Sequence, residues 1–287
     1  MSKIIIYSPS YNPNSGGIIV LHKLCDILLN LGYDAGFFIQ DNQPFYTSSA
    51  YKSQGYYLSD IDLENDLIIY PEIVWGNPLN GKNIVRYIMN IGHVTLNRKD
   101  TWGENDHWIY YSERFYDGIK PKNILNISDS KLDYFKDYKL ERNIEDCFTY
   151  RKQLENVNSI KKYHSPTAVE ISFNCGDEFL INVFNSCKNF YCYDVESHLS
   201  TLASLCGCNS IIISDNETRE NIIDKQPIFK YGIAFGVEEI EKASQTRHLL
   251  REHLIQIEKQ QIINVANYFT NILNIPSNEN THILQTL

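Results

Sequence analysis

Residues 3–24 read KIIIYSPSYNPNSGGIIVLHKL, and this stretch predicts how the chain begins to fold. The run Lys3–Tyr7 is apolar and rich in β-branched residues, as expected for a buried parallel strand. A glycine-containing loop follows, and from Ile18 onward apolar residues recur at helical spacing. Gly32 suits the end of that helix, and Ala35–Ile39 suits a second strand. The stretch therefore predicts a β-α-β unit.

The rest of the chain alternates apolar, strand-like runs with helical patterns, which is typical of an α/β sheet. The charged stretch Asp129–Asp146 separates two such sets and is interpreted as a solvated helix or linker. We therefore expect domains over 1–130 and 131–255, followed by a C-terminal helix and tail over 256–287. The other expected strands are Asp66–Tyr70, Asn83–Asn90, Trp108–Ser112, Ile124–Ile127, Cys147–Tyr150, Ala168–Ile171, Phe190–Tyr193 and Asn209–Ser214. The later helices are expected at Glu178–Cys187, Ser197–Cys206 and Val237–Leu273.

Composition limits the classes of function. The 287 residues carry a formal net charge of −9, which argues against a nucleic-acid partner because phosphate backbones favour basic surfaces. The seven cysteines include no CxxC pair, and the single CxC at Cys206 and Cys208 lacks a partner pair. We expect buried free thiols in a reducing compartment rather than zinc ligands or disulfides.

The sequence carries no recognisable signal for export or membrane insertion. The N-terminal apolar run is too short for a signal peptide, and no apolar stretch approaches the ~20 residues that span a bilayer. A cytoplasmic protein is expected, either free or at the inner face of the membrane.

The loop before the first helix is the first candidate site. Backbone N–H groups at a helix N-terminus attract anions, and Gly16 and Gly17 would let a ligand approach the backbone closely. The simpler interpretation is a turn in which Ser15 caps the helix. The loop lacks the GxGxxG pattern of nicotinamide-binding folds and the lysine of a Walker loop.

The second candidate lies in residues 190–215, where a strand ends at Tyr193 and a helix follows. Ligands of α/β sheets bind at such carboxyl ends, and Asp194 or Glu196 could accept both hydroxyls of a ribose. The alternative is helix capping by Asp194 and Ser197, with Glu196 favoured by the helix dipole.

A basic pair is the third candidate. Arg151 and Lys152 follow an expected strand in an acidic protein, which suits a diphosphate ligand. The commoner alternative is a solvated basic turn.

Several isolated side chains are weaker candidates. Glu72 and His93 each follow an expected strand and could serve as a catalytic base, as could Asp41, although structural roles are the alternative for each. The DxD pattern at Asp60–Asp62 precedes a strand rather than following a suitable one, so we interpret it as chance.

Four stretches together resemble a known family: NPNSGGIIVLHKLCDILLNLGY, IIYPEIVWGNPLNGKNIVRYIMNIG, YDVESHLSTLASLCGCNSIIISD and KYGIAFGVEEIEKASQTRHLL. In order and spacing they resemble glycosyltransferases of the GT-B fold, and in particular family-4-like enzymes of bacterial surface-polysaccharide synthesis. The resemblance covers residues 3 to about 255. It implies two Rossmann-like domains facing a cleft, with a C-terminal helical segment.

The resemblance also implies roles for the candidate residues. The N-terminal domain would bind the acceptor, and the C-terminal domain would bind a nucleotide-sugar. Gly16 and Gly17 would approach the donor phosphate or sugar, while Arg151 and Lys152 would neutralise the diphosphate, so that no metal is needed. The remaining donor contacts implied by the resemblance are Tyr193, Asp194, Glu196 and Ser197.

One departure from the family pattern is clear. Common retaining members carry a second glutamate in the turn and helix that contain Glu196, and it binds the ribose. Here Leu202, Ala203 and Ser204 occupy the corresponding positions, and none of them is acidic.

The sequence therefore predicts a metal-independent glycosyltransferase that moves a sugar from a nucleotide-diphosphate donor to a glycan or lipid-linked glycan in surface polysaccharide or lipooligosaccharide synthesis. The nucleotide-sugar would be a substrate, with no separate cofactor. The alternative is a non-catalytic glycan-binding or partner protein on a degenerate GT-B fold.

Overall fold

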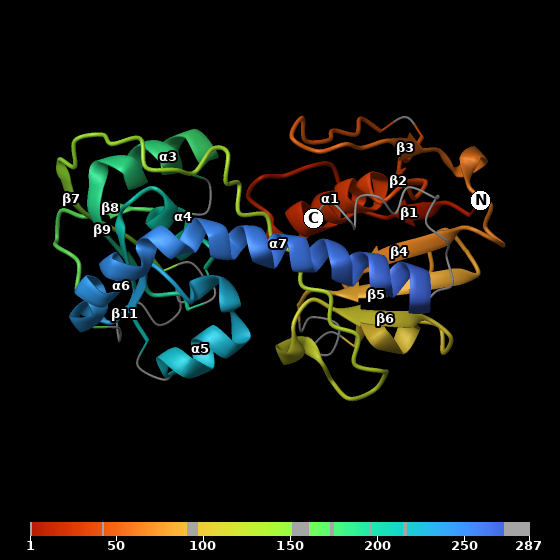
Figure 1. Ribbon diagram of the computed structural model, residues 1–287. Helices are drawn as coiled ribbons and strands as arrows, with labels where there is room; N and C mark the ends of the chain where they lie inside the picture. Colours follow the sequence, from red (N-terminus) through yellow and green to blue (C-terminus); the bar gives the residue numbers. More distant parts are fainter. Residues whose placement is uncertain are drawn as a thin grey trace. The chain divides into compact units, whose positions relative to one another are not determined.

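The computed structural model describes residues 2–41, 43–90, 97–150, 161–172, 175–195, 197–214 and 217–272 (Figure 1). The chain divides into two compact units. The first unit holds Met1–Asp129 together with Glu258–Leu287, and the second holds Ser130–Ile257. Each unit contains one parallel sheet with associated helices, which confirms the α/β fold class expected from the sequence.

The first unit contains a six-stranded sheet in the order β3-β2-β1-β4-β5-β6, and every pair in it is parallel. This is the strand order of a Rossmann fold. The order reverses between β1 and β4, where Ile4 pairs with Leu67. The strands are β1 (Ile4–Ile6), β2 (Ala35–Phe38), β3 (Gly55–Tyr56), β4 (Leu67–Pro71), β5 (Asn83–Ile88) and β6 (His107–Tyr110).

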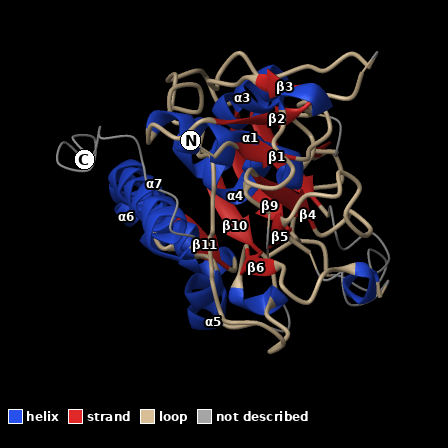
Figure 2. Ribbon diagram, turned by 90° about the vertical axis from the view of Figure 1, so that its right-hand side faces the viewer, coloured by secondary structure: helices blue, strands red, loops and turns tan. Residues whose placement is uncertain are grey.

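Helix α1 (Gly16–Asn30) provides the crossover from β1 to β2. It buries Leu21, Leu24 and Leu28 in the same core as β1, and it ends before Gly32, whose φ of 85° favours glycine. Figure 2 shows long loops around β3 to β6, where the connections carry short 3₁₀ turns. The run expected as a strand at Ile124–Ile127 forms only an isolated bridge to Tyr110.

The end of the chain completes the core of the first unit. Helix α7 (Leu250–Asn267) and the following π-helical turn Tyr268–Ile272 bring Val265 and Phe269 into the core that α1 covers. The Gln261 amide also donates to Ser128 Oγ at 2.8 Å. The single helix expected over 237–273 is instead divided, because 3₁₀ turns at Val237–Glu239 and Arg247–Leu249 flank α6 (Ile240–Thr246).

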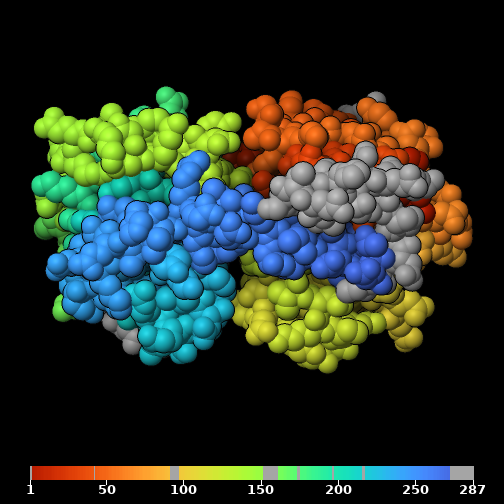
Figure 3. All heavy atoms as spheres, viewed as in Figure 1, coloured from red at the N-terminus to blue at the C-terminus, as the bar shows by residue number. Residues whose placement is uncertain are grey.

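The second unit contains a five-stranded parallel sheet in the order β11-β10-β9-β7-β8. Read from β8, this is the doubly wound order 2-1-3-4-5, and the order reverses between β7 and β9. Strand β7 begins within the charged stretch expected as a linker, and β11 is too short for the sequence pattern to show. The elements are β7 (Ile144–Thr149), β8 (Val169–Glu170), α3 (Asp177–Ser186), β9 (Cys187–Cys192), α4 (Leu199–Leu205), β10 (Asn209–Ile212), α5 (Arg219–Lys225) and β11 (Ile233–Phe235). In the space-filling view, α5 and α6 lie at the surface of this unit (Figure 3).

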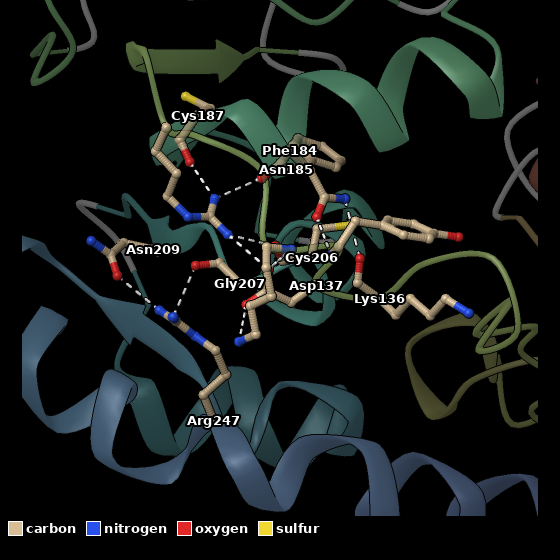
Figure 4. Close-up of polar contacts among 12 residues, drawn as sticks. Lys136, Asp137, Phe184, Asn185, Cys187, Cys206, Gly207, Asn209 and Arg247 are labelled. Carbon is tan, nitrogen blue, oxygen red and sulfur yellow. Dashed lines mark hydrogen bonds and ion pairs between the residues drawn. The ribbon is translucent and has the colours of Figure 1, made fainter.

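One arginine joins the ends of two helices in the second unit. Arg142 Nη1 donates to the carbonyls of Phe184 and Cys187 at 3.0 and 2.6 Å, at the end of α3. Its Nη2 donates to Cys206 O at 2.7 Å, at the end of α4 (Figure 4). The last carbonyls of a helix have no intrahelical partner, and a cation there also favours the helix dipole.

Replacing this side chain tests its contribution to stability. We expect Arg142→Met to lower the free energy of unfolding by about 2–3 kcal/mol, because charge-assisted hydrogen bonds to three buried carbonyls are lost. Arg142→Lys should recover only part of this, since an ammonium lacks the planar fork. Denaturant unfolding provides the measurement, with Arg251→Met as a control because Arg251 is exposed and its described hydrogen bond is a single one, to Leu132 O. Equal losses in Arg142→Met and the control would contradict the role given to Arg142.

Candidate functional site

The carboxyl edge of the first sheet gathers residues that the sequence singled out. Glu72 directly follows β4 and is 5% exposed, and its Oε2 accepts the Met89 N–H at 3.1 Å. Met89 follows β5, and a Cβ placed on Gly17 would lie 3.5 Å from Met89 Cε. The glycine turn and Glu72 therefore lie at the same edge, where the strand order of this unit reverses.

The glycine loop opens a helix as predicted. Helix α1 begins at Gly16, and the loop is closed by bonds from the N–H groups of Ser15 and Asn14 to Asn12. The Ser15 side chain makes no capping hydrogen bond, so the simpler interpretation of Ser15 as a side-chain cap is wrong. Among the described residues, a Cβ at Gly16 would meet no atom within 4 Å, so the space beside this residue at the start of the helix is open.

In the second unit, two predicted stretches meet at the edge where the strand order reverses. Thr149 at the end of β7 pairs with Cys192 at the end of β9. The next residues along each strand are Tyr150 and Tyr193, and their rings stack with centroids 4.9 Å apart. The Tyr193 hydroxyl accepts the Tyr163 N–H at 2.8 Å. Tertiary structure thus brings the stretch that leads to the basic pair beside the stretch that leads to Asp194.

Three of the predicted donor-binding side chains are buried at this edge of the sheet. Tyr193, Asp194 and Ser197 are each 3% exposed, which suits support of a bound ligand more than an open contact surface. The Asp194 carbonyl accepts the Ser197 N–H at 3.1 Å. Ser197 does not cap the helix, because α4 begins at Leu199 with His198 at the capping position.

A cavity of about 280 Å³ opens beyond the carboxyl ends of β10 and β11. Tyr163 belongs to its lining and also donates its N–H to Tyr193, so the cavity adjoins the edge described above. It lies at the carboxyl edge of the sheet, the side on which α/β proteins bind ligands, beyond the outer strands and not at the reversal between β7 and β9. The lining residues are Tyr163, Ile212, Ile213, Ser214, Glu217, Thr218, Arg219, Ile222, Phe235, Gly236, Val237 and Glu238.

Two adjacent glutamates near this cavity have different surroundings. Glu239 Oε2 accepts from Arg219 Nη1 at 2.6 Å and from the Phe235 N–H at 3.2 Å, so it positions the arginine and the turn after β11. Glu238 is exposed and lines the cavity. Gly236 has a φ of 96°, and a Cβ there would lie 2.4 Å from Glu238 Oε1. The turn therefore requires glycine for the glutamate to lie as it does.

Sequence reasoning missed Glu238, Glu239 and Arg219. The signal was present in KYGIAFGVEE, where a short apolar run is followed by glycine and then by acidic residues at the start of a helical pattern. This is the same strand, glycine and helix order that singled out the start of the chain. The run forms only the three residues of β11, which is too short to be recognised by periodicity.

The other predicted residues are placed as follows. His93, Arg151, Lys152 and Glu196 lie outside the described residues. Asp41 is exposed beyond β2. The carboxylates of Asp60 and Asp62 accept backbone N–H groups of Tyr57 and Glu64, respectively, so local turns account for the DxD pattern.

A buried histidine lies beneath the glycine loop. His22 on α1 stacks on Phe37 with ring centroids 4.2 Å apart, and its Nε2 lies 3.5 Å from Pro9 O. Burial lowers the pKa of His22 from its ordinary value of 6.5, and the contact with Pro9 opposes this only in part. Burial likewise lowers the pKa of His164 in the second unit.

These pKa directions predict a pH dependence of stability. As the pH falls below 6.5, His22 becomes protonated in the unfolded chain but stays largely neutral in the folded chain, because its folded-state pKa is lower. The free energy of unfolding therefore decreases as the pH falls toward the folded-state pKa of His22. His22→Phe should reduce the slope of unfolding free energy against pH by at most about 1.4 kcal/mol per pH unit, the limit for one proton. Denaturant unfolding from pH 7.5 to 5 measures it. The exposed His107→Gln is the control, and an unchanged slope in His22→Phe would contradict the assignment.

The comparisons with known proteins identify the fold. No family model and no curated protein matches the sequence. Among the described residues, no helix is long and apolar enough to cross a membrane. Solved structures do match over nearly the whole chain, as follows.

The DNA-modifying enzyme β-glucosyltransferase matches with a TM-score of 0.56 and 9% identity, over 94% of this chain and 99% of its own. T4 phage BGT in complex with UDP-glucose matches with a TM-score of 0.53, with the same identity and coverage. An α-glucosyltransferase in complex with UDP matches with a TM-score of 0.50 and 10% identity, over 94% of this chain and 96% of its own. Identities this low establish the fold alone, and that fold is the GT-B fold of the T4 phage glucosyltransferases.

Proposed function

We propose that this protein is a glycosyltransferase that moves a sugar from a nucleotide-diphosphate donor to an acceptor hydroxyl. The observation that carries the proposal is the cavity at the carboxyl ends of β10 and β11, which combines the aromatic side chains of Tyr163 and Phe235 with the exposed carboxylate of Glu238. Structures with the same fold hold UDP-glucose or UDP. The proposal extends this donor class to the present chain.

The second unit is proposed to bind the donor. The base would lie in the cavity beside Tyr163 and Phe235, and Glu238 would accept hydrogen bonds from the ribose hydroxyls. Glu238 would thus replace the ribose-binding second glutamate, which is missing from the helix after Tyr193. Arg151 and Lys152 follow β7 in the sequence and are proposed to neutralise the diphosphate as the bond to the sugar breaks.

The first unit is proposed to bind the acceptor and supply the catalytic base. Glu72 is the candidate that the structure describes, and its contact with the Met89 N–H would hold one carboxylate oxygen in place. His93 is the second candidate. Gly16 and Gly17 would admit the transferred sugar or its phosphate close to the backbone at the start of α1. Catalysis would rest on orientation and charge stabilisation.

The acceptor is proposed to be a glycan or lipid-linked glycan of surface polysaccharide or lipooligosaccharide synthesis. The net charge of −9 disfavours a polyanionic acceptor. One protein of the same fold is described as a DNA-modifying enzyme, so duplex DNA belongs in the acceptor panel as the competing case. We propose a metal-independent reaction. Since T4 phage BGT has been solved with UDP and Mn²⁺, each assay is run with and without EDTA.

Donor binding can be tested without knowing the acceptor. A matching nucleotide-sugar at a hundredfold excess over its dissociation constant should stabilise the folded protein by about 2.7 kcal/mol, seen as a rise in melting temperature. Glu238→Gln should weaken that ligand about tenfold or more, because a charge-assisted hydrogen bond is lost. Arg151→Ala should weaken it as well.

The control for donor binding is Glu241→Gln, which changes an exposed glutamate of α6 that does not line the cavity. A panel of UDP-, GDP-, CMP- and dTDP-sugars with no stabilising member would overturn the proposal in favour of a non-catalytic protein. Binding that requires a divalent metal would overturn metal independence.

Catalysis can be separated from binding at Glu72. Glu72→Gln should lower kcat for sugar transfer by about 100-fold or more, while donor affinity stays unchanged, because only the proton-accepting group is lost. Product formation from labelled donor measures kcat, and Glu64→Gln is the control because Glu64 is exposed and lies before β4. Full activity in Glu72→Gln would remove Glu72 from the mechanism and leave His93 as the candidate.

A further inference from the structure

Three cysteines from separate elements meet in the core of the second unit. Cys147 lies on β7, Cys187 begins β9, and Cys208 directly precedes β10. Their sulfur atoms all lie within 4.8 Å of one another, and all three side chains are 0% exposed. The cluster stands apart from the donor cavity, since Cys187 and Cys208 lie at the amino ends of strands whose carboxyl ends reach that cavity or its adjoining edge.

The upper limit on the distances between the sulfurs is compatible with a single bound ion. An ion with metal–sulfur bonds of about 2.3 Å separates three ligands by roughly 3.8–4.0 Å, whether the arrangement is tetrahedral or trigonal. That lies within the 4.8 Å limit of the cluster. An iron–sulfur cluster calls for four cysteine ligands, and the residues that the structure describes assemble three.

The surroundings carry positive charge that could offset bound thiolates. Arg142 donates to Cys187 O, and Arg247 Nη1 donates to Gly207 O at 2.9 Å, next to Cys208. Figure 4 shows Arg247 hydrogen-bonded to both Gly207 and Asn209. Two acidic groups oppose this charge. Asp137 Oδ1 lies 3.6 Å from Arg142 Nη2, and the Asp146 carboxylate near Cys187 accepts from Ser165 N–H at 2.8 Å.

The thiols also interact with one another. Hydrogen bonds from Cys147 and Cys208 lower the pKa of the Cys187 thiol, whereas burial raises the pKa of Cys147 and of Cys208 well above their ordinary values. The three sulfur atoms are thus close enough to hydrogen-bond with one another.

We propose that Cys147, Cys187 and Cys208 bind one soft, thiophilic metal ion, with Cu⁺ as the ion that this set matches best. Soft thiolate ligands select Cu⁺ and Zn²⁺ over harder ions. Structural zinc completes a tetrahedron with a fourth ligand, whereas Cu⁺ can be satisfied by three thiolates. The bound ion would join β7, β9 and the turn before β10, and it would stabilise the second unit without taking part in sugar transfer.

The test uses the full chain, reduced and freed of metal, under anaerobic conditions. Because the cluster is fully buried, Cu⁺ is supplied during refolding, in competition with a Cu⁺ chelator of known affinity. We expect one Cu⁺ per chain and a higher melting temperature. X-ray absorption should show sulfur ligands only, three per ion. Zn²⁺ is tested in parallel, and binding of Zn²⁺ alone would overturn the assignment of Cu⁺.

Single variants locate the site. Cys147→Ser, Cys187→Ser and Cys208→Ser should each lose the bound ion, whereas Cys192→Ser should keep it. Cys192 is the matched control because it is equally buried in the same sheet but outside the cluster. Circular dichroism checks that each variant folds. Less than one ion per chain in the unaltered protein, nitrogen or oxygen ligands in the absorption spectrum, or equal loss in Cys192→Ser would each overturn the proposal.

Discussion

Parallel strand pairing is the constraint on which the rest of this structure depends. Every strand of both sheets is parallel to its neighbours, so each connection must cross over and all carboxyl ends in a sheet meet at one edge. In the first unit this edge holds the glycine turn before α1 and Glu72. In the second it holds Tyr150, Tyr193 and the cavity beyond β11. The reversal of strand order in each sheet separates neighbouring crossovers and leaves room for a ligand there.

The opposite edge of the second sheet has a different role. Arg142 binds the last carbonyls of α3 and α4, and Arg247 reaches the turn before β10. These groups would otherwise be carbonyls with no helical partner, so the two cations hold the elements in place. Cys187 and Cys208 lie at this edge, and Cys147 on β7 completes the cluster of three thiols. In the second unit, the proposed metal site and the candidate donor site are therefore separate: the arginine contacts lie toward the amino edge of the sheet, and the cavity lies at the carboxyl edge.

The candidate donor site contains both basic and acidic side chains. Arg219 is paired with Glu239, while Glu238 faces the cavity. An exposed carboxylate suits hydroxyl groups, from which it accepts hydrogen bonds, and it disfavours a bare anion. The diphosphate is instead proposed to bind Arg151 and Lys152, which follow β7 in the sequence. The overall acidity of the chain then bears on the acceptor more than on the donor.

The sequence by itself determined the α/β class, the strand–glycine–helix start and most long elements, because buried parallel strands and amphipathic helices leave strong local patterns. It also indicated that the stretches around Tyr150 and Tyr193 follow strand ends. Only tertiary structure decided that these strands are neighbours, that β11 exists, and that Glu238 lines a cavity. It likewise brought together Cys147, Cys187 and Cys208, which are far apart in the sequence. Strand order and side-chain proximity depend on long-range packing, and no local pattern records them.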